Sequence, residues 1–319
     1  MNVKLLQLLM DRDDYVSGEE ISNMFNVSRS AIWKQIKVLK EAGYEIEGIS
    51  KKGYKLLSKP DIINQDIINS KLNTEFIGRN IYYYDKLSST NETAKTLADE
   101  AKDGSLVISE KQIGGKGRLG RTFESPLGGV WMSIILKPNI EPENASKLTQ
   151  LAGASLITLL KDMGINSLIK WPNDIYVNDK KICGILTEMK CDMDEIHYLI
   201  VGIGINVNFP IEKLPEELHQ KATSLKTEFD RTYDRNEFIA NFLNIFESYY
   251  NDLVVNNNYK KVVKICQENS IILNKEAYLI TPKNKEKVQC IGINDDGCLI
   301  VRTETGETKK VISGEITFH

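Results

Sequence analysis

The sequence predicts an α+β protein built from three successive parts. Residues 1–60 carry three helical patterns followed by two short strands, residues 61–270 mix apolar strands with amphipathic helices, and residues 271–319 alternate as short strands. A chain of 319 residues exceeds the usual size of one domain, and a hydrophobic fraction of 41% suffices to build sizeable cores. We therefore expect each part to be a separate domain.

Helix signals are clear in the first part. Apolar residues between positions 3 and 10 give a first helix with a broad buried face. Ser17 is the expected N-cap of a second helix, with Glu20 as its capping-box partner. Ser28 is the expected N-cap of a third helix over residues 29–41. The buried stripe of that helix has spacings of four and three residues: Ile32, Ile36 and Leu39.

Two short strands complete the first part. Gly43 ends the third helix, and residues 44–46 and 53–56 alternate around a basic tip. This order predicts a winged helix-turn-helix, in which the third helix enters the major groove of DNA and the wing touches the phosphates. The residues expected to bind DNA lie on the exposed face of the third helix and at the wing tip: Ser28, Arg29, Ser30, Trp33, Lys34, Lys37, Lys51 and Lys52.

Charge supports a polyanionic partner for this part. Residues 27–59 hold eight Lys or Arg and three Glu, a net charge of +5 in a chain whose total is −3. A local basic surface of this kind suits nucleic acid. The alternative is a helical dimerisation or docking module without DNA contact.

A glycine-rich loop at residues 114–121, Gly-Gly-Lys-Gly-Arg-Leu-Gly-Arg, stands out in the central part. Glycines let the backbone approach a ligand, and Lys116, Arg118 and Arg121 supply charge for carboxylate or phosphate oxygens. The loop also matches the Gly-x-Gly-x-x-Gly dinucleotide fingerprint, but that motif needs a following helix, which Pro126 opposes. A glycine-rich hairpin with solvated cations is the other alternative.

Polar residues gather elsewhere in the central part. Ser-Thr-Asn at 89–91 precedes a helix, where a hydroxyl serves equally well as an N-cap. Gln112 follows an apolar strand, and Lys-Trp-Pro-Asn-Asp at 170–174 suits either a ligand site or ordinary turn chemistry. Lys181 begins a strand that buries one face, a position from which an ammonium group often points into a cleft.

Composition limits the protein class. No run of about 18 apolar residues appears, and the chain opens on an amphipathic helical pattern, so we expect a cytoplasmic protein without a membrane part. The five cysteines are scattered, without a Cys-x-x-Cys pair, and only three histidines are present. This pattern argues against disulfides and structural zinc.

The last part follows a helical stretch expected from Arg235 to about Cys266. Four short strands, separated by turns, then predict a small β barrel. These strands are expected at residues 277–281, 287–293, 298–302 and 308–311.

Five motifs occur in a fixed order: Ser-Thr-Asn at 89–91, Gly-Lys-Gly-Arg-x-Gly-Arg at 115–121, Lys-Trp-Pro-Asn-Asp at 170–174, Lys-Ile-Cys-Gly-Ile-Leu at 181–186 and Gly-Ile-Gly-Ile-Asn at 202–206. With them, the chain resembles over essentially its whole length the bifunctional biotin protein ligase and biotin operon repressor family. The resemblance implies a class II synthetase-like central domain and an SH3-like C-terminal domain. Two positions depart from the pattern: Lys116, where many members have arginine, and Phe123, where many have tryptophan.

The resemblance implies a two-step reaction. Biotin and ATP form biotinyl-5′-adenylate and pyrophosphate, and the biotinyl group then passes to one lysine of a biotin-carrier domain of a biotin-dependent carboxylase. ATP and Mg²⁺ are the implied cofactors. The resemblance also implies a homodimer that forms when the adenylate binds and that represses biotin synthesis or transport genes from operator DNA, with the adenylate as corepressor.

Site residues follow from the same resemblance. The implied catalytic residues are Lys181, Arg118 and Arg121. The implied biotin-binding residues are Ser89, Thr90, Asn91, Gln112, Lys116, Gly117, Arg118, Lys181 and Gly184. The implied nucleotide-binding residues are Arg118, Arg121, Lys170, Trp171, Asn173 and Asn206, with Asp174 as a magnesium ligand.

Three rival functions remain open from the sequence. A ligand-sensing repressor without catalysis would keep the winged helix and the pocket but could lose Lys181 or Arg118, and both are present. A lipoate-attaching ligase would also adenylate an acyl acid, although the tryptophan turn and the glycine loop favour biotin. The third rival is an enzyme whose N-terminal domain no longer binds DNA.

Overall fold

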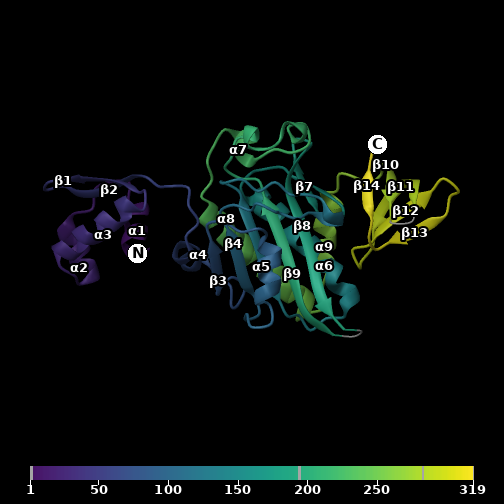
Figure 1. The fold of residues 1–319 in the computed structure, drawn as a ribbon, viewed down its shortest axis with the longest axis horizontal. Helices are drawn as coiled ribbons and strands as arrows, with labels where there is room; N and C mark the ends of the chain where they lie inside the picture. The colour runs from purple at the N-terminus through teal and green to yellow at the C-terminus, as the bar shows by residue number, and fades with distance from the viewer. Residues whose placement is uncertain (1–2, 193–194, 282–283, 319) are drawn as a thin grey trace. The chain divides into compact units, whose positions relative to one another are not determined.

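The computed structural model describes residues 3–192, 195–281 and 284–318, and the chain divides into two compact units, residues 1–67 and 68–319 (Figure 1). In the described part of the first unit, helices precede a two-stranded antiparallel sheet: α1 (Val3–Met10), α2 (Gly18–Phe25), α3 (Arg29–Glu41), β1 (Glu45–Ile49) and β2 (Gly53–Ser58). This order confirms the winged helix-turn-helix prediction. The three-domain boundaries at 60/61 and 270/271 stay predictions.

Local signals explain these elements. Ser17 Oγ accepts from the backbone N–H of Glu20 at 3.0 Å, and Ser28 Oγ accepts from that of Ala31 at 3.2 Å, so both predicted N-caps are present. Gly43 follows α3 with a positive φ of 92°, a conformation that glycine adopts at little cost.

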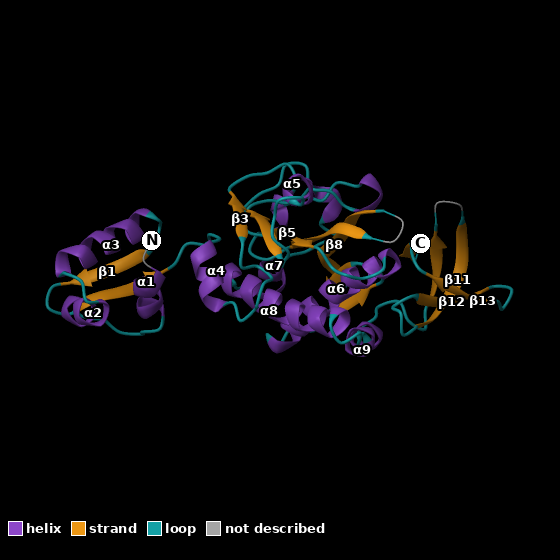
Figure 2. Cartoon of the chain, turned by 90° about the horizontal axis from the view of Figure 1, so that it is seen from below, coloured by secondary structure: helices purple, strands orange, loops and turns teal. Residues whose placement is uncertain are grey.

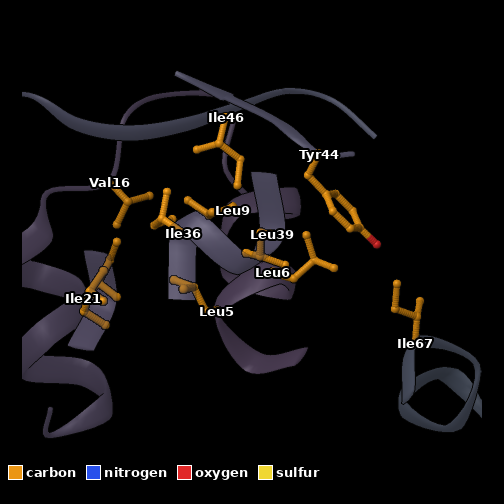
Figure 3. Close-up of a cluster of buried hydrophobic side chains, with 11 residues drawn as sticks. Leu5, Leu6, Leu9, Val16, Ile21, Ile36, Leu39, Tyr44, Ile46 and Ile67 are labelled. Atoms are coloured by element: carbon orange, nitrogen blue, oxygen red, sulfur yellow. The ribbon is translucent and has the colours of Figure 1, made fainter. Parts of the chain in front are cut away.

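One hydrophobic core holds the first unit together (Figure 3). The buried stripes of α1, α2 and α3 meet Ile46 of β1 and Ile67, which lies on α4 (Gln65–Lys71). Full burial of each Leu or Ile side chain contributes about 1.5–3 kcal/mol. The basic face of α3 therefore stays outside, because the apolar face is occupied.

A seven-stranded mixed sheet forms the centre of the second unit, in the order β3-β4-β5-β9-β8-β7-β6. Its strands are β3 (Ile81–Tyr84), β4 (Ser105–Ser109), β5 (Val130–Leu136), β6 (Leu168–Lys170), β7 (Asp174–Val177), β8 (Lys180–Cys191) and β9 (Ile196–Ile205). All seven residues of β5 are buried, as expected for a strand covered on both faces.

Helices cover both faces of that sheet. Figure 2 shows α5 (Thr90–Leu97) on one side and α6 (Ala145–Asp162), α8 (Arg235–Val254) and α9 (Lys260–Glu268) on the other. A short helix, α7 (Leu225–Phe229), lies between β9 and α8 in the chain. Among the described helices, none combines the length and the apolar character that a membrane crossing requires.

The prediction of one helical stretch from Arg235 to about Cys266 was wrong, because the structure has two helices there. α8 ends at Val254 and α9 begins at Lys260. Three consecutive asparagines occupy positions 256–258, and Asn257 has a positive φ of 47°. Asparagine tolerates this conformation and competes with the helical backbone for hydrogen bonds, so the apolar pattern alone did not reveal the break.

The C-terminal strands form a five-stranded antiparallel sheet in the order β13-β12-β11-β10-β14. The strands are β10 (Glu276–Ile280), β11 (Lys285–Ile293), β12 (Leu299–Thr303), β13 (Thr308–Val311) and β14 (Glu315–Thr317). The first four confirm the predicted strands to within two residues. The sequence analysis missed β14, which has only three residues.

Candidate active site

A pocket over β8 and β9 brings the sequence motifs together. Its unfilled space is about 950 Å³, including the open solvent at its mouth. The predicted residues that line it are Ser89, Thr90, Asn91, Gln112, Lys116, Gly117, Arg118, Arg121, Lys170, Trp171, Asn173, Asp174, Lys181 and Gly184.

Hydroxyl and amide groups fill one end of the pocket. The backbone N–H of Thr90 donates to Gln112 Oε1 at 2.7 Å, and Gln112 Nε2 donates to Ser125 Oγ at 2.8 Å. Ser89 occupies the N-cap position of α5, but its buried side chain makes no capping hydrogen bond. Its hydroxyl therefore serves the pocket wall and not the helix end.

Asn91 lies beneath this end in a fixed orientation. Its Oδ1 accepts from Ser133 Oγ at 2.6 Å, and its Nδ2 donates to Glu188 Oε2 at 2.8 Å. A methyl group at Gly202 would come within 2.0 Å of Asn91 Oδ1. The glycine of β9 is thus required by the close approach of the amide, and Gly202 belongs to the site although its role was not predicted.

Glycines also form the floor under the glycine loop. Gly184 of β8 pairs with Gly204 of β9, and a methyl group at either would lie within 2.8 Å or 2.6 Å of the Phe123 ring. Phe123 packs edge-on against buried Trp131, with ring centroids 6.0 Å apart. The two facing glycines leave room for the Phe123 ring, which lies against both of them.

Cations dominate the part of the pocket formed by the glycine loop, the tryptophan turn and the start of β8. Five Lys and Arg side chains line the pocket with two carboxylates, Asp174 and Glu315, in the described part of the chain. Lys181 Nζ lies 2.7 Å from Asp174 Oδ1. Burial lowers the pKa of Lys170, although Asp174 acts in the opposite direction. This excess of positive charge suits an anionic ligand.

The glycine loop is attached to the C-terminal sheet by both of its arginines. Arg118 donates to Asn173 Oδ1 at 3.1 Å and to the carbonyl of Gly314 at 2.9 Å. Arg121 forms two hydrogen bonds with the Glu315 carboxylate, at 2.9 and 2.7 Å. These bonds hold the pKa of Glu315 below its ordinary value, and burial of the Arg118 guanidinium lowers its pKa.

Glu315 and Ile316 also line the pocket, and neither was predicted from the sequence. Glu315 lies 194 positions after Arg121, so no local pattern linked them. The loop itself contains a short 3₁₀ turn, Arg118–Gly120, and no α-helix follows it before β5. The dinucleotide fingerprint therefore lacks the helix that this motif requires.

Two predicted site residues make hydrogen bonds with other parts of the protein. Lys116 lines the pocket, but its Nζ donates to Glu92 Oε1 at 2.9 Å, and this bond lowers the pKa of Glu92. Asn206 is not among the lining residues. Asn206 follows the end of β9, and its buried Nδ2 donates to the carbonyl of Thr223 at 2.8 Å. This hydrogen bond joins the segment after β9 to the segment before α7.

A separate groove lies on the first unit between α3 and the wing. Among the predicted DNA-binding residues, it is lined by Arg29, Trp33, Lys37 and Lys51. The others, Ser28, Ser30, Lys34 and Lys52, are exposed around it. Trp33 is 57% exposed, and Arg29 pairs with Glu19 at 2.6 Å.

Comparison with known proteins agrees with this arrangement. The model of the biotin/lipoate A/B protein ligase family matches residues 83–206, an HTH domain matches 3–55, and the biotin protein ligase C-terminal domain matches 280–318. The bifunctional ligase/repressor BirA of Bacillus subtilis is 38% identical over 307 residues, 95% of this chain and 94% of its own. The chain belongs to the bifunctional biotin ligase/repressor family.

More distant biotin ligase/repressors and ligases are similar over less of the chain. The bifunctional ligase/repressor BirA of Escherichia coli is 29% identical and covers 75% of this chain and 73% of its own. A solved structure of the Aquifex aeolicus biotin protein ligase in complex with biotin and ATP has a TM-score of 0.65 at 28% identity. It covers 75% of this chain and 98% of its own.

Proposed function

We propose that this biotin ligase/repressor binds biotin at the hydroxyl and amide end of the pocket and ATP at the cationic end, and joins them in between. The observation that carries the proposal is the position of Lys181, which lines one pocket together with Gln112 and the loop arginines. The Aquifex aeolicus ligase of similar fold was solved with biotin and ATP. Biotin ligase activity follows from the family, whereas the residue roles are our assignment.

The biotin side uses neutral hydrogen-bonding groups. Ser89, Thr90 and Gln112 bind the ureido ring or the tail of biotin, and Asn91 supports them from below through Ser133. Gly184 contributes to the biotin side because its missing side chain lets the Phe123 ring and Lys181 approach the β8 backbone; a methyl group there would lie 2.8 Å from the ring and 3.2 Å from Lys181 Nζ. Lys116 and Gly117, both in the glycine loop, also bind biotin once the Lys116 ammonium group has left Glu92.

The nucleotide side uses the cations and the tryptophan turn. Arg118 and Arg121 bind the phosphates, and Lys170, Trp171 and Asn173 contact the nucleotide. In the first step a biotin carboxylate oxygen bonds to the α-phosphorus while the bond to pyrophosphate breaks. Lys181 moves from Asp174 to the two approaching anions, because cations fixed near both groups offset their repulsion in a site that excludes water.

The pocket offers few side-chain ligands for a magnesium ion. The described residues hold no group of three His, Cys, Asp or Glu side chains that would bind a metal ion by themselves. Mg²⁺ usually takes one or two carboxylates and otherwise phosphates and water, and Asp174 offers one carboxylate. These donors fit an ion that arrives with ATP, where it would neutralise charge on the leaving pyrophosphate.

In the second step, the amine of a carrier-domain lysine attacks the biotinyl carbonyl of the adenylate, and AMP leaves. The loop excludes water from the mixed anhydride until the acceptor arrives. Neither step forms a covalent bond between biotin and the ligase itself.

Repression uses the first unit. The exposed basic face of α3 and the wing tip bind operator DNA, and the adenylate acts as corepressor by favouring a homodimer whose two winged helices fit a palindrome. The biotin synthesis or transport genes are the regulated genes, and the cytoplasm is the proposed location. The acceptor is the carrier domain of a biotin-dependent carboxylase.

Labelled biotin, Mg·ATP and a purified biotin-carrier domain test the enzymatic proposal. Wild type transfers label to the carrier lysine, and Arg118→Gly releases free biotinyl-adenylate because its loop no longer binds Asn173 and the C-terminal sheet. Excess lipoate leaves the transfer unchanged. Transfer of lipoate in place of biotin contradicts the substrate assignment, and no transfer at all leaves a biotin-sensing repressor.

A further inference from the structure

The turn between β11 and β12, residues 294–297, reaches the pocket wall through one backbone carbonyl. Trp171 Nε1 donates to the oxygen of Gly297 at 3.2 Å, and Gln150 Nε2, from α6, donates to the same oxygen at 2.6 Å. Both donor side chains are buried, 3% and 4% exposed. One acceptor in the turn between β11 and β12 therefore fixes a side chain of α6 and a side chain of the turn after β6, and the second of these, Trp171, lines the pocket.

The orientation of Gln150 is set at its other end. The hydroxyl of Tyr259, on the chain just before α9, lies 3.2 Å from Gln150 Oε1 and 3.2 Å from the carbonyl of Lys147. Burial raises the pKa of Tyr259 well above its ordinary value, so the hydroxyl keeps its proton and donates. Gln150 Oε1 is therefore the acceptor, and its NH₂ group faces Gly297.

Gly297 is adapted to this close approach. Its φ is +80°, and a methyl group on it would lie 2.5 Å from Gln150 Oε1. Its own N–H closes the turn by donating to the carbonyl of Asn294 at 2.8 Å. A buried amide that touches a glycine backbone transmits its position directly, because no flexible side chain separates the two.

Trp171 is the first residue of the segment 171–174, which lines the nucleotide side of the pocket. Two residues later, Asn173 accepts from Arg118 and donates to the carbonyl of Ile185 at 3.0 Å. We propose that Gln150 is a positioning residue, which acts through the Gly297 carbonyl on Trp171 and thereby makes the C-terminal turn part of the ATP site. This inference rests on the proposed function, because it assigns that side of the pocket to the nucleotide.

The test compares Gln150→Met with Thr158→Val in the full-length chain. Methionine keeps the volume of Gln150 but donates no hydrogen bond. Thr158 lies on the same helix, where its Oγ1 bonds to the Tyr249 hydroxyl at 2.9 Å, and it does not line the pocket. Biotin-dependent ATP–pyrophosphate exchange gives KM for ATP and for biotin separately, and thermal unfolding gives Tm for each variant.

Gln150→Met raises KM for ATP by about 5- to 20-fold, the equivalent of one hydrogen bond, and changes KM for biotin less than about twofold. Thr158→Val lowers Tm but leaves both KM values unchanged. An unchanged KM for ATP, or equal increases for both substrates, overturns the inference. Absence of exchange in wild type contradicts the proposed function instead, and the inference fails with it.

If Gln150→Met does not fold, Gln150→Asn is measured in the same way. Asparagine keeps the amide but withdraws it from Gly297 by one methylene group. The same selective increase in KM for ATP is expected, and its absence overturns the inference.

Discussion

The Phe123 ring lies against the backbone of Gly204, so close that a methyl group on the glycine would come within 2.6 Å of the ring. Phe123 lies two residues after the glycine loop, and Gly204 lies on β9 at the pocket floor. The loop is therefore anchored on the sheet by an aromatic ring that needs a glycine beneath it. The smaller ring at position 123, where many family members have tryptophan, is accommodated by contact with Trp131.

Gly204→Ala should displace Phe123 and loosen the end of the loop. We expect the rate of biotinyl-adenylate release to rise by about tenfold, the effect of losing roughly 1.4 kcal/mol of packing. Release of labelled adenylate from the preloaded protein measures it. Gly292→Ala is the control, because a methyl group there meets nothing within 4 Å. Equal release from both variants would contradict the anchoring role.

Glu315→Gln should free Arg121 and expose the loop to trypsin. We expect trypsin to cleave after Arg121 faster in this variant than in wild type. Glu212→Gln is the control, because it changes an exposed glutamate far from Arg121 in the sequence, and its cleavage rate should equal that of wild type. The pKa of Glu315 is lowered by Arg121, so the pair is intact above the ordinary glutamate pKa and is lost only as the pH falls through the lowered value.

The wild-type cleavage rate, corrected for trypsin activity, should therefore not change between pH 8 and pH 6. Protection that disappears within this neutral range would contradict the ion pair as the restraint.

Arg235→Met should be strongly destabilising. Arg235 is 1% exposed, and its NH1 group donates to Glu110 Oε2 at 2.8 Å and to the carbonyl of Gly129 at 2.9 Å. Removing one partner of a buried pair costs about 3–5 kcal/mol of unfolding free energy. Denaturant unfolding measures this loss. Lys264→Gln, which removes an exposed pair with Glu268, should change it by less than about 0.5 kcal/mol.

The DNA-binding face offers two distinguishable substitutions. Lys37→Gln should weaken binding to all DNA sequences alike and reduce the salt slope by about one, because Lys37 is a cation on the exposed face of α3. Trp33→Ala should leave that slope unchanged but lower the ratio of operator to random-DNA affinity by about tenfold or more. Titrations over a range of salt concentrations separate the two effects, and identical behaviour would contradict the assignment.

The sequence predicted the winged helix because its signals are local. Caps at Ser17 and Ser28 and the spacing of Ile32, Ile36 and Leu39 depend only on neighbouring residues. The pocket-lining motifs were found because each carries several unusual residues within a few positions. Asn206 stays a predicted nucleotide-binding residue, and in this structure its amide donates to the backbone carbonyl of Thr223.

Contacts between distant segments were not predictable. The approach of Glu315 to Arg121, of Gly297 to Trp171 and of Arg235 to Glu110 depends on tertiary packing across more than a hundred residues. Glu315, Gly297, Arg235 and Glu110 are ordinary in their local sequence, and the motifs that contain Arg121 and Trp171 do not reveal these partners. The glycines at 202 and 204 belonged to a recognised motif, but the groups that approach them, Asn91 and Phe123, are visible only in the folded sheet.

Biotin-dependent ATP–pyrophosphate exchange with Lys181→Gln is the most direct test of the central claim. Glutamine keeps most of the length and removes the charge that lies 2.7 Å from Asp174. We expect exchange to fall by about 100- to 1000-fold, because Lys181 offsets the repulsion between two anions, while folding measured by Tm is retained. Exchange within about twofold of wild type would contradict the account.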